Sequence, residues 1–261
     1  MFKFEDNKCY RMPAHFGGWV FNPDAQTIYH DVVSLSYSYG TDGDRLADYI
    51  PEGFELTKPE LLIVYQQCRQ IDWMAGSYYN LITVAAPVRF CGQRDQLEGV
   101  FTLVVWENKT TPILTGQQMG VPKIHADIED LHIVADTYRT RASYEGCTFL
   151  EMEMTEPKPM GKEQVEALSA DVNSLGWRYV PKVGAPGAEL SQPILFPRRE
   201  EAHSAWIGRG RVQWTELKWE ENPMQWHIIK ALAGLPMIAM GSVMLTKGRA
   251  ILMESRGRVL K

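Results

Sequence analysis

The chain has 261 residues, of which 45% are hydrophobic and 11% aromatic, and its formal net charge is -5 at pH 7. This composition is ordinary for a globular enzyme, and the length allows one large hydrophobic core or two modest ones. The negative charge argues against a nucleic-acid surface, because phosphate binding relies on clustered basic side chains. Two short basic segments, 197–199 and 209–211, fit solvated loop charges.

The sequence also allows expectations about cellular location, disulfides and metal sites. No segment approaches the roughly 18 apolar residues of a membrane-spanning helix, and the first eight residues lack the apolar stretch of a signal peptide. We therefore expect a cytoplasmic protein that binds neither membrane nor nucleic acid. The cysteines are scattered and the histidines fit no zinc-ligand spacing, so we expect reduced thiols, no metal and no other cofactor.

Alternation of apolar and polar residues dominates the chain and predicts a mainly antiparallel sheet. The expected strands, in chain order, are 32–39, 61–67, 79–90, 100–106, 132–138, 148–154, 209–219 and 250–254. Helices are few, and the expected ones are 44–49, 162–175 and 223–232. The second of these has Val165, Leu168 and Val172 at helical spacing and is followed by Gly176, a plausible helix stop.

The order of these elements predicts the architecture. The late strands look necessary to complete a sheet that begins before residue 100, so we expect residues 1–261 to form a single domain. The segment 183–193 is rich in turn-forming residues and is typical of a surface loop. Closure into a barrel removes the exposed edges that so many strands would leave. The predicted fold class is therefore mainly β (α+β), a closed antiparallel β-barrel with a few peripheral helices.

Lys123 is the most informative residue for function. It lies in the segment 116–127, Gly-Gln-Gln-Met-Gly-Val-Pro-Lys-Ile-His-Ala-Asp, where apolar strands on both sides should bury it. A buried ammonium is costly unless it is paired or gives up its proton. The neutral amine can attack a ketone and form a Schiff base. The alternative is a solvated lysine in a turn, which is the common state of a lysine that follows proline.

Several segments, in the right order over roughly residues 30 to 255, resemble the acetoacetate decarboxylase superfamily. The segment from Gly116 to Lys123 is similar to the glycine, polar pair, apolar stretch and Pro-Lys that carry the family's Schiff-base lysine. Weaker matches are 44–56, 87–92, 222–224, 234–237 and 245–251. The resemblance implies a cone-shaped barrel, Lys123 as the nucleophile and a closed homo-oligomer, which we expect to be a dimer or tetramer.

The chain departs from the family pattern around this lysine. Ile124 replaces the second lysine of the authentic decarboxylase, and Gln117 and Gln118 replace an arginine and a glutamate. The family's two carboxylates fall on Val64 and near residues 79–81, none of which is acidic. The resemblance therefore implies a site that has lost its acidic cluster.

The candidate site residues follow from the resemblance and from strand parity. The catalytic candidates are Lys123 and Gln118, and the substrate-binding candidates are Tyr79, Gln66, Val64, Gln117 and Met119. Val64 and Gln66 share one face of an extended strand, whereas Tyr78 and Tyr79 must point to opposite faces. The family alignment favours Tyr79 as the one that reaches the pocket. His125 shares the lysine's face on a strand, which fits a hydrogen bond at the pocket edge.

These observations predict a Schiff-base-forming lyase that acts on a small oxo acid of the pyruvate or β-keto acid type. Schiff-base chemistry needs an electron sink, proton shuttles and orientation, whereas decarboxylation must also bind and expel a carboxylate. Loss of the charged cluster therefore favours aldol condensation and dehydration, with an aldehyde as second substrate. This resembles the superfamily's aldolase-dehydratase branch. Two alternatives are a true acetoacetate decarboxylase and a non-catalytic barrel that binds a hydrophobic small molecule.

Overall fold

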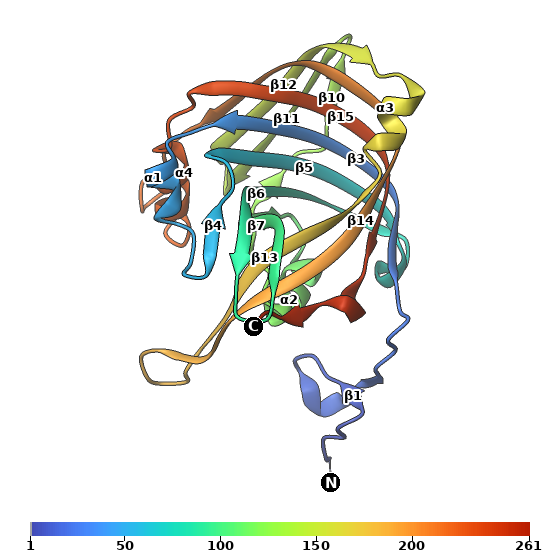
Figure 1. Ribbon diagram of the computed structural model, residues 1–261, viewed down its shortest axis with the longest axis vertical. Helices are drawn as coiled ribbons and strands as arrows, with labels where there is room; N and C mark the ends of the chain where they lie inside the picture. The colour runs from blue at the N-terminus through green and yellow to red at the C-terminus, as the bar shows by residue number, and fades with distance from the viewer. Residues whose placement is uncertain (1) are drawn as a thin grey trace.

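Seven strands form a closed ring, which the computed structural model describes within residues 2–261 (Figure 1). In ring order they are β3 (Thr27–Gly40), β5 (Glu60–Ile71), β6 (Ser77–Cys91), β7 (Gln96–Glu107), β13 (Ala170–Pro181), β14 (Ala188–Trp214) and β15 (Ala239–Leu252). Neighbours pair antiparallel except β7 and β13, whose short contact is parallel. The expected closed, mainly antiparallel barrel is confirmed, with one parallel seam.

The strand β14 closes the ring because it is long enough to pair on both sides. Its first part pairs with β13, residues 198–208 pair with β15, and residues 206–214 pair with β12 (Cys147–Pro159). Residues 209–214 of the expected strand 209–219 are thus the end of a 27-residue strand, whereas residues 215–219 lie outside it. Only residues 183–187 of the expected loop 183–193 lie outside strands, since β14 begins at Ala188.

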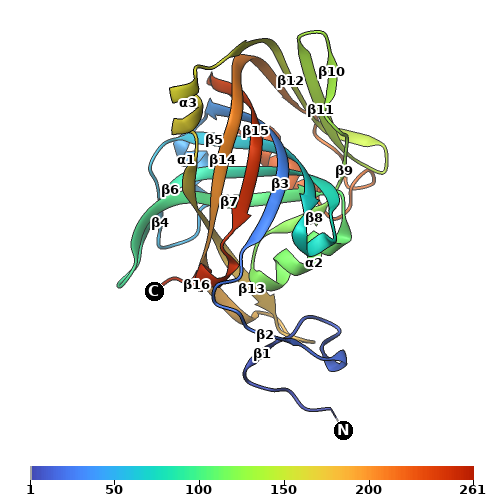
Figure 2. The same ribbon diagram turned by 90° about the vertical axis from the view of Figure 1, so that its right-hand side faces the viewer.

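A second layer of strands continues from β14 through β12 (Figure 2). It contains β11 (Thr137–Tyr144) and β10 (His132–Val134), which form a hairpin. The single strand expected over 132–138 is therefore wrong: Ala135 has a φ of 49° and reverses the chain there. The remaining short strands are β1 (Lys8–Cys9), β2 (Trp19–Val20), β4 (Phe54–Leu56), β8 (Lys123–His125), β9 (Asp127–Ile128) and β16 (Arg258–Val259).

Helices are short and lie outside the ring (Figure 1). They are α1 (Gly43–Ala47), α2 (Thr110–Met119), α3 (Lys162–Ala167) and α4 (Trp226–Ala233), with 3-10 turns η1 (Ala14–Phe16), η2 (Asp72–Met74) and η3 (Glu254–Arg256). The expected helix 162–175 stops at Ala167, because the residues from Ala170 onward pair with β14. The sequence reading missed α2. No helix within residues 2–261 has the length and apolar character to cross a bilayer.

Strand alternation divides the ring wall into two faces, and this division positions the site. On β5, the side chains of Ile63 and Tyr65 are fully buried in a core that includes Phe149 of β12 and Ile229 of α4. The intervening residues of the same strand face the interior of the ring, where they line a cavity. One wall therefore provides both the packing that holds the barrel and the lining of its interior.

Candidate active site

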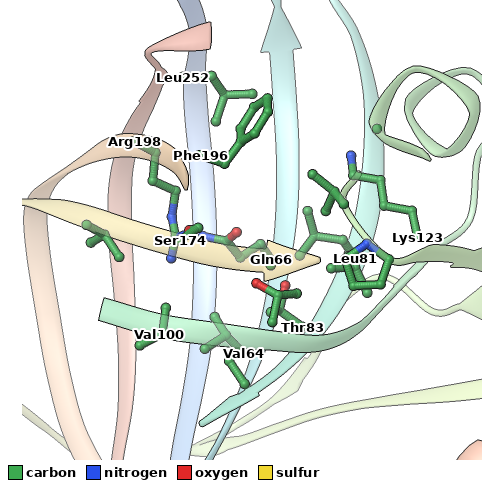
Figure 3. Close-up of a pocket in the computed structure, with 18 of the residues that line it drawn as sticks. Val64, Gln66, Leu81, Thr83, Val100, Lys123, Ser174, Phe196, Arg198 and Leu252 are labelled. Atoms are coloured by element: carbon green, nitrogen blue, oxygen red, sulfur yellow. The ribbon is translucent and has the colours of Figure 1, made fainter. Parts of the chain in front are cut away.

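The ring encloses a cavity of about 300 Å³, a size suited to a small organic molecule (Figure 3). Its walls come from the inner faces of the ring strands, from β8 and from the end of α2. Most lining side chains are aliphatic. The polar and titratable exceptions include Lys123, Glu107, Tyr79, Gln66, Cys68, Thr83 and Arg198. A largely apolar cavity with a few convergent polar groups is typical of ligand sites.

Lys123 reaches this cavity through a β–α–β connection. The chain runs along β7, crosses over through α2 and returns as β8, which pairs parallel with β7. The register places Lys123 beside Val105 and His125 beside Glu107. Because side chains two residues apart share a face, Val105, Glu107 and Lys123 all point to the same side.

The helix α2 provides room for the lysine at Gly116. A Cβ atom at Gly116 would overlap Cδ and Cε of Lys123, so the lysine stem lies directly against this helical backbone. The helix ends at Gly120, whose φ of 97° is the left-handed conformation that favours glycine. The chain then turns and enters β8.

Lys123 forms a buried ion pair with Glu107. Its Nζ lies 2.8 Å from Oε1 of Glu107 and donates to the carbonyl oxygen of Pro112 at 3.2 Å. The side chain of Lys123 is 16% exposed and that of Glu107 is fully buried. Neither carboxylate oxygen has a hydrogen bond of good geometry within residues 2–261. Burial raises the pKa of Glu107, and the neighbouring lysine only partly opposes this.

The expectation of a site without a carboxylate was wrong. Glu107 supplies one, from a position outside those at which the family pattern places its acidic residues. The ammonium of Lys123 therefore has a partner, which removes much of the cost of burying it. A proton on either group can move to the other within hydrogen-bonding distance.

A chain of hydrogen bonds leads to Tyr79 on the cavity wall. The indole Nε1 of Trp73 donates to the hydroxyl of Tyr29 at 3.2 Å, and that hydroxyl lies 3.2 Å from the hydroxyl of Tyr79. The indole of tryptophan can only donate, so the Tyr29 hydroxyl accepts from Trp73 and can itself donate a hydrogen bond to the Tyr79 hydroxyl. The hydroxyl hydrogen of Tyr79 then remains available to a ligand in the cavity. Burial raises the pKa of both phenols, so they stay protonated at neutral pH.

The structure brings most of the sequence-predicted residues to one cavity. The lining includes Lys123, Tyr79, Gln66, Val64 and Met119. Tyr78 is 50% exposed on the other side of the strand. His125 is exposed and is not part of this lining.

Gln117 and Gln118 lie elsewhere, beside a second hollow near the N-terminal segment. Gln117 donates through Nε2 to the backbone oxygen of Lys123 at 2.7 Å. The helix explains this placement: Met119 is three residues after Gly116 and shares its face, whereas the two glutamines are rotated away. No part of either glutamine lines the cavity that holds the lysine amine.

Sequence reasoning missed Glu107, Tyr29, Cys68 and Arg198 as cavity residues. Arg198 was interpreted as a solvated loop charge, but it lies within β14 and lines the cavity. Signals for Glu107 were present. Pro112 in the first turn and Gly120 after the last residue are typical of helix ends, so a helix could have been predicted between them. A helix that connects two strands indicates a parallel pair, which would have placed β8, with Lys123, beside β7, with Glu107.

Comparison with known sequences identifies relatives. A family model described as acetoacetate decarboxylase (ADC) matches residues 11–250. Curated acetoacetate decarboxylases of Burkholderia ambifaria and Burkholderia cenocepacia are 29% identical to this chain over 131 residues, which is 50% of this chain and 49% of theirs. The chain thus spans about half the length of the curated relatives it matches.

Several solved structures share the fold. Acetoacetate decarboxylase from Legionella pneumophila has a TM-score of 0.74 at 18% identity, over 94% of this chain and 92% of that one. The enduracididine biosynthesis enzyme MppR, solved with pyruvate, has a TM-score of 0.73 at 15% identity, over 97% of each chain. An acetoacetate decarboxylase-like enzyme from Sphingomonas wittichii RW1 has a TM-score of 0.72 at 16% identity, over 97% of this chain and 98% of that one.

Proposed function

This chain belongs to the acetoacetate decarboxylase family, and from that membership we propose that it is a Schiff-base-forming lyase that acts on a small oxo acid. The observation that carries the proposal is the amine of Lys123, held 2.8 Å from the buried Glu107 in a largely apolar cavity. A primary amine with an adjacent proton acceptor is the pair that imine chemistry requires.

The first stage is condensation of the lysine with the carbonyl. A proton passes from Nζ of Lys123 to Glu107, whose pKa is raised by burial. The amine attacks the carbonyl carbon while the hydroxyl of Tyr79 donates to the carbonyl oxygen. Glu107 returns its proton as the carbinolamine loses water, which leaves a protonated imine that draws electrons from the adjacent carbon.

The second stage is carbon–carbon bond formation. Glu107 takes a proton from the carbon next to the imine, and the resulting enamine attacks the carbonyl carbon of an aldehyde, whose oxygen receives that proton back from Glu107. Loss of water from the adduct and hydrolysis of the imine release the product and restore Lys123. MppR offers support by its solved complexes with pyruvate and with the condensation product of pyruvate and imidazole 4-carboxaldehyde. We therefore propose an oxo acid of the pyruvate type and an aldehyde as the substrates.

A β-keto acid decarboxylase is the second candidate. It is supported by the curated relatives, which are named acetoacetate decarboxylases. In that reaction the imine accepts the electrons released when the carbon–carboxylate bond breaks, and the enamine is then protonated. The family's acidic positions are the apolar Val64 and the phenolic Tyr79 here, but Glu107 and Glu200 line the same cavity. The lining thus fits both reactions, and the complexes of MppR favour condensation.

Reductive trapping tests the proposal. The protein is incubated with pyruvate or acetoacetate, reduced with borohydride, and analysed by intact mass and peptide mapping. We expect one adduct, on Lys123, and its loss in Lys123→Arg, because arginine stays charged and cannot condense with a ketone. Lys109→Arg is the matched control, since Lys109 contacts the exposed Tyr78 outside the cavity.

The outcomes separate the candidates. The absence of an adduct with every oxo compound would contradict lyase chemistry and favour a barrel that only binds small molecules. Rapid release of carbon dioxide from acetoacetate, with no condensation of pyruvate and aldehydes, would replace the aldol reaction with decarboxylation. Condensation and dehydration without carbon dioxide release would support the first candidate.

A further inference from the structure

Arg198 faces the cavity on a different side from Lys123 (Figure 3). Lys123 comes from β8, whereas Arg198 comes from β14 and sits next to Ser174 of β13. The condensation chemistry proposed above involves only the end of the cavity that holds Lys123, Glu107 and Tyr79. The guanidinium at the other end is therefore a charged group without an assigned task.

The guanidinium is held in a fixed orientation. Its Nε donates to Oε1 of Glu200 at 2.8 Å, and its Nη1 donates to the hydroxyl of Ser174. Its Nη2 makes no hydrogen bond to any residue in 2–261. The side chain is 29% exposed, so it is largely screened from bulk water. A positioned guanidinium with a free donor edge is the group that proteins use to bind carboxylates.

The wall between the two ends is mainly aliphatic. Figure 3 shows Val64, Leu81, Val100 and Leu252 among the side chains that surround this space, and all of them line the cavity. Each methylene group that a ligand buries there should increase affinity about fourfold. Pyruvate alone has no methylene chain and leaves this surface and the guanidinium without contacts.

We infer that one substrate is an extended oxo acid, with a carbonyl for Lys123, an aliphatic middle and a terminal carboxylate for Arg198. The inference rests on the proposed imine chemistry and names the substrate class that this cavity selects. Glu200 holds the guanidinium through Nε and Ser174 holds it through Nη1, which leaves Nη2 to the carboxylate. A second hollow of about 130 Å³ also touches Arg198, so the chain can extend beyond it.

Matched ketone probes test this inference. One series consists of methyl ketones with a terminal carboxylate, from 5-oxohexanoate to 8-oxononanoate, and the other of alkan-2-ones of equal chain length. Imine formation is titrated by borohydride trapping and intact mass. At the best chain length, the carboxylated probe should bind about 10- to 100-fold tighter than its neutral partner. In Arg198→Met, which keeps an apolar stem, this ratio should fall to about one.

Arg199→Met is the matched control. Arg199 is the next residue on β14, but it pairs with Asp171 and Glu201 and does not line the cavity. The wild-type ratio should persist in this variant. The comparison of probes in the wild type needs no variant, so it decides the question even if Arg198→Met does not fold.

Three results would overturn the inference. The first is equal affinity of the carboxylated and neutral ketones at every chain length, and the second is an unchanged ratio of their affinities in folded Arg198→Met. The third is tighter binding of methyl ketones that carry a terminal amine, which would assign recognition to Glu200. Acetone is the reference ketone that distinguishes failure of this inference from failure of the proposed function. An acetone adduct without a carboxylate preference overturns this inference alone, whereas no adduct with any ketone overturns the proposed function as well.

Discussion

Glu107 and Lys123 form an ion pair with 2.8 Å between Oε1 and Nζ, although a whole helix separates them in the sequence. The two residues lie on β7 and β8, which are parallel neighbours joined by α2. Their side chains point to the same face and meet at the cavity. Four predictions follow from this geometry and its surroundings.

Replacement of Glu107 by glutamine should separate imine formation from turnover. The amide keeps the size of the carboxylate but cannot accept a proton, so turnover should fall by about 10²- to 10⁴-fold. The borohydride adduct on Lys123 should form more slowly but still accumulate on long incubation, because trapping needs only a single condensation. Glu98→Gln on the same strand is the control, because Glu98 is exposed and pairs with Arg89. Steady-state rates near those of the wild type in Glu107→Gln would exclude Glu107 from proton transfer.

The free energy of unfolding should depend on pH through the protonation of Glu107. Burial raises its pKa above the usual 4.5, so the folded state binds this proton more tightly than the unfolded state. As the pH rises from 4.5 through the raised pKa, the unfolding free energy of the wild type should therefore fall relative to that of Glu107→Gln. The decrease should be at most about 1.4 kcal/mol per pH unit. Denaturant unfolding of both proteins measures this difference. A rise of the wild-type unfolding free energy relative to that of Glu107→Gln over the same pH range would contradict the sign.

A methyl group at Gly116 should displace the reactive amine. In Gly116→Ala the new Cβ would overlap the lysine stem, so Lys123 must move. Imine formation should slow by about 100-fold, since misplacement of a reacting group by an ångström has an effect of that order. Helix stability should not suffer, because alanine is the better helix former. Leu114→Ala, at an exposed position of the same helix, is the control for trapping kinetics. Equal trapping rates in the two variants would refute the steric argument.

Removal of one hydroxyl should test the hydrogen-bond chain. Tyr79→Phe keeps the buried ring and loses the proton donor that faces the cavity, so turnover should fall by about 10- to 100-fold. Tyr78→Phe is the adjacent control, because Tyr78 is half exposed and contacts Lys109. Comparable turnover in the two variants would show that the Tyr79 hydroxyl takes no part in the reaction.

Local patterns in the sequence were enough to predict several features of this protein. The alternation of apolar residues predicted the main strands, and it also predicted that Val64 and Gln66 face one side of β5. The same rule placed Tyr78 and Tyr79 on opposite faces, and the family resemblance favoured Tyr79, which lines the cavity, over the exposed Tyr78. These predictions succeeded because a strand repeats every two residues, so the orientation of a side chain depends only on its neighbours in the chain.

Tertiary structure alone decided which distant residues meet. Glu107 reaches Lys123 only because β8 pairs parallel with β7, and Arg198 reaches the cavity only because β14 closes the ring. The helix α2 turns Gln117 and Gln118 away from the cavity that holds the amine of Lys123. Such contacts depend on the pairing of segments far apart in the chain, and the free energy of that pairing comes from the whole barrel rather than from any local pattern.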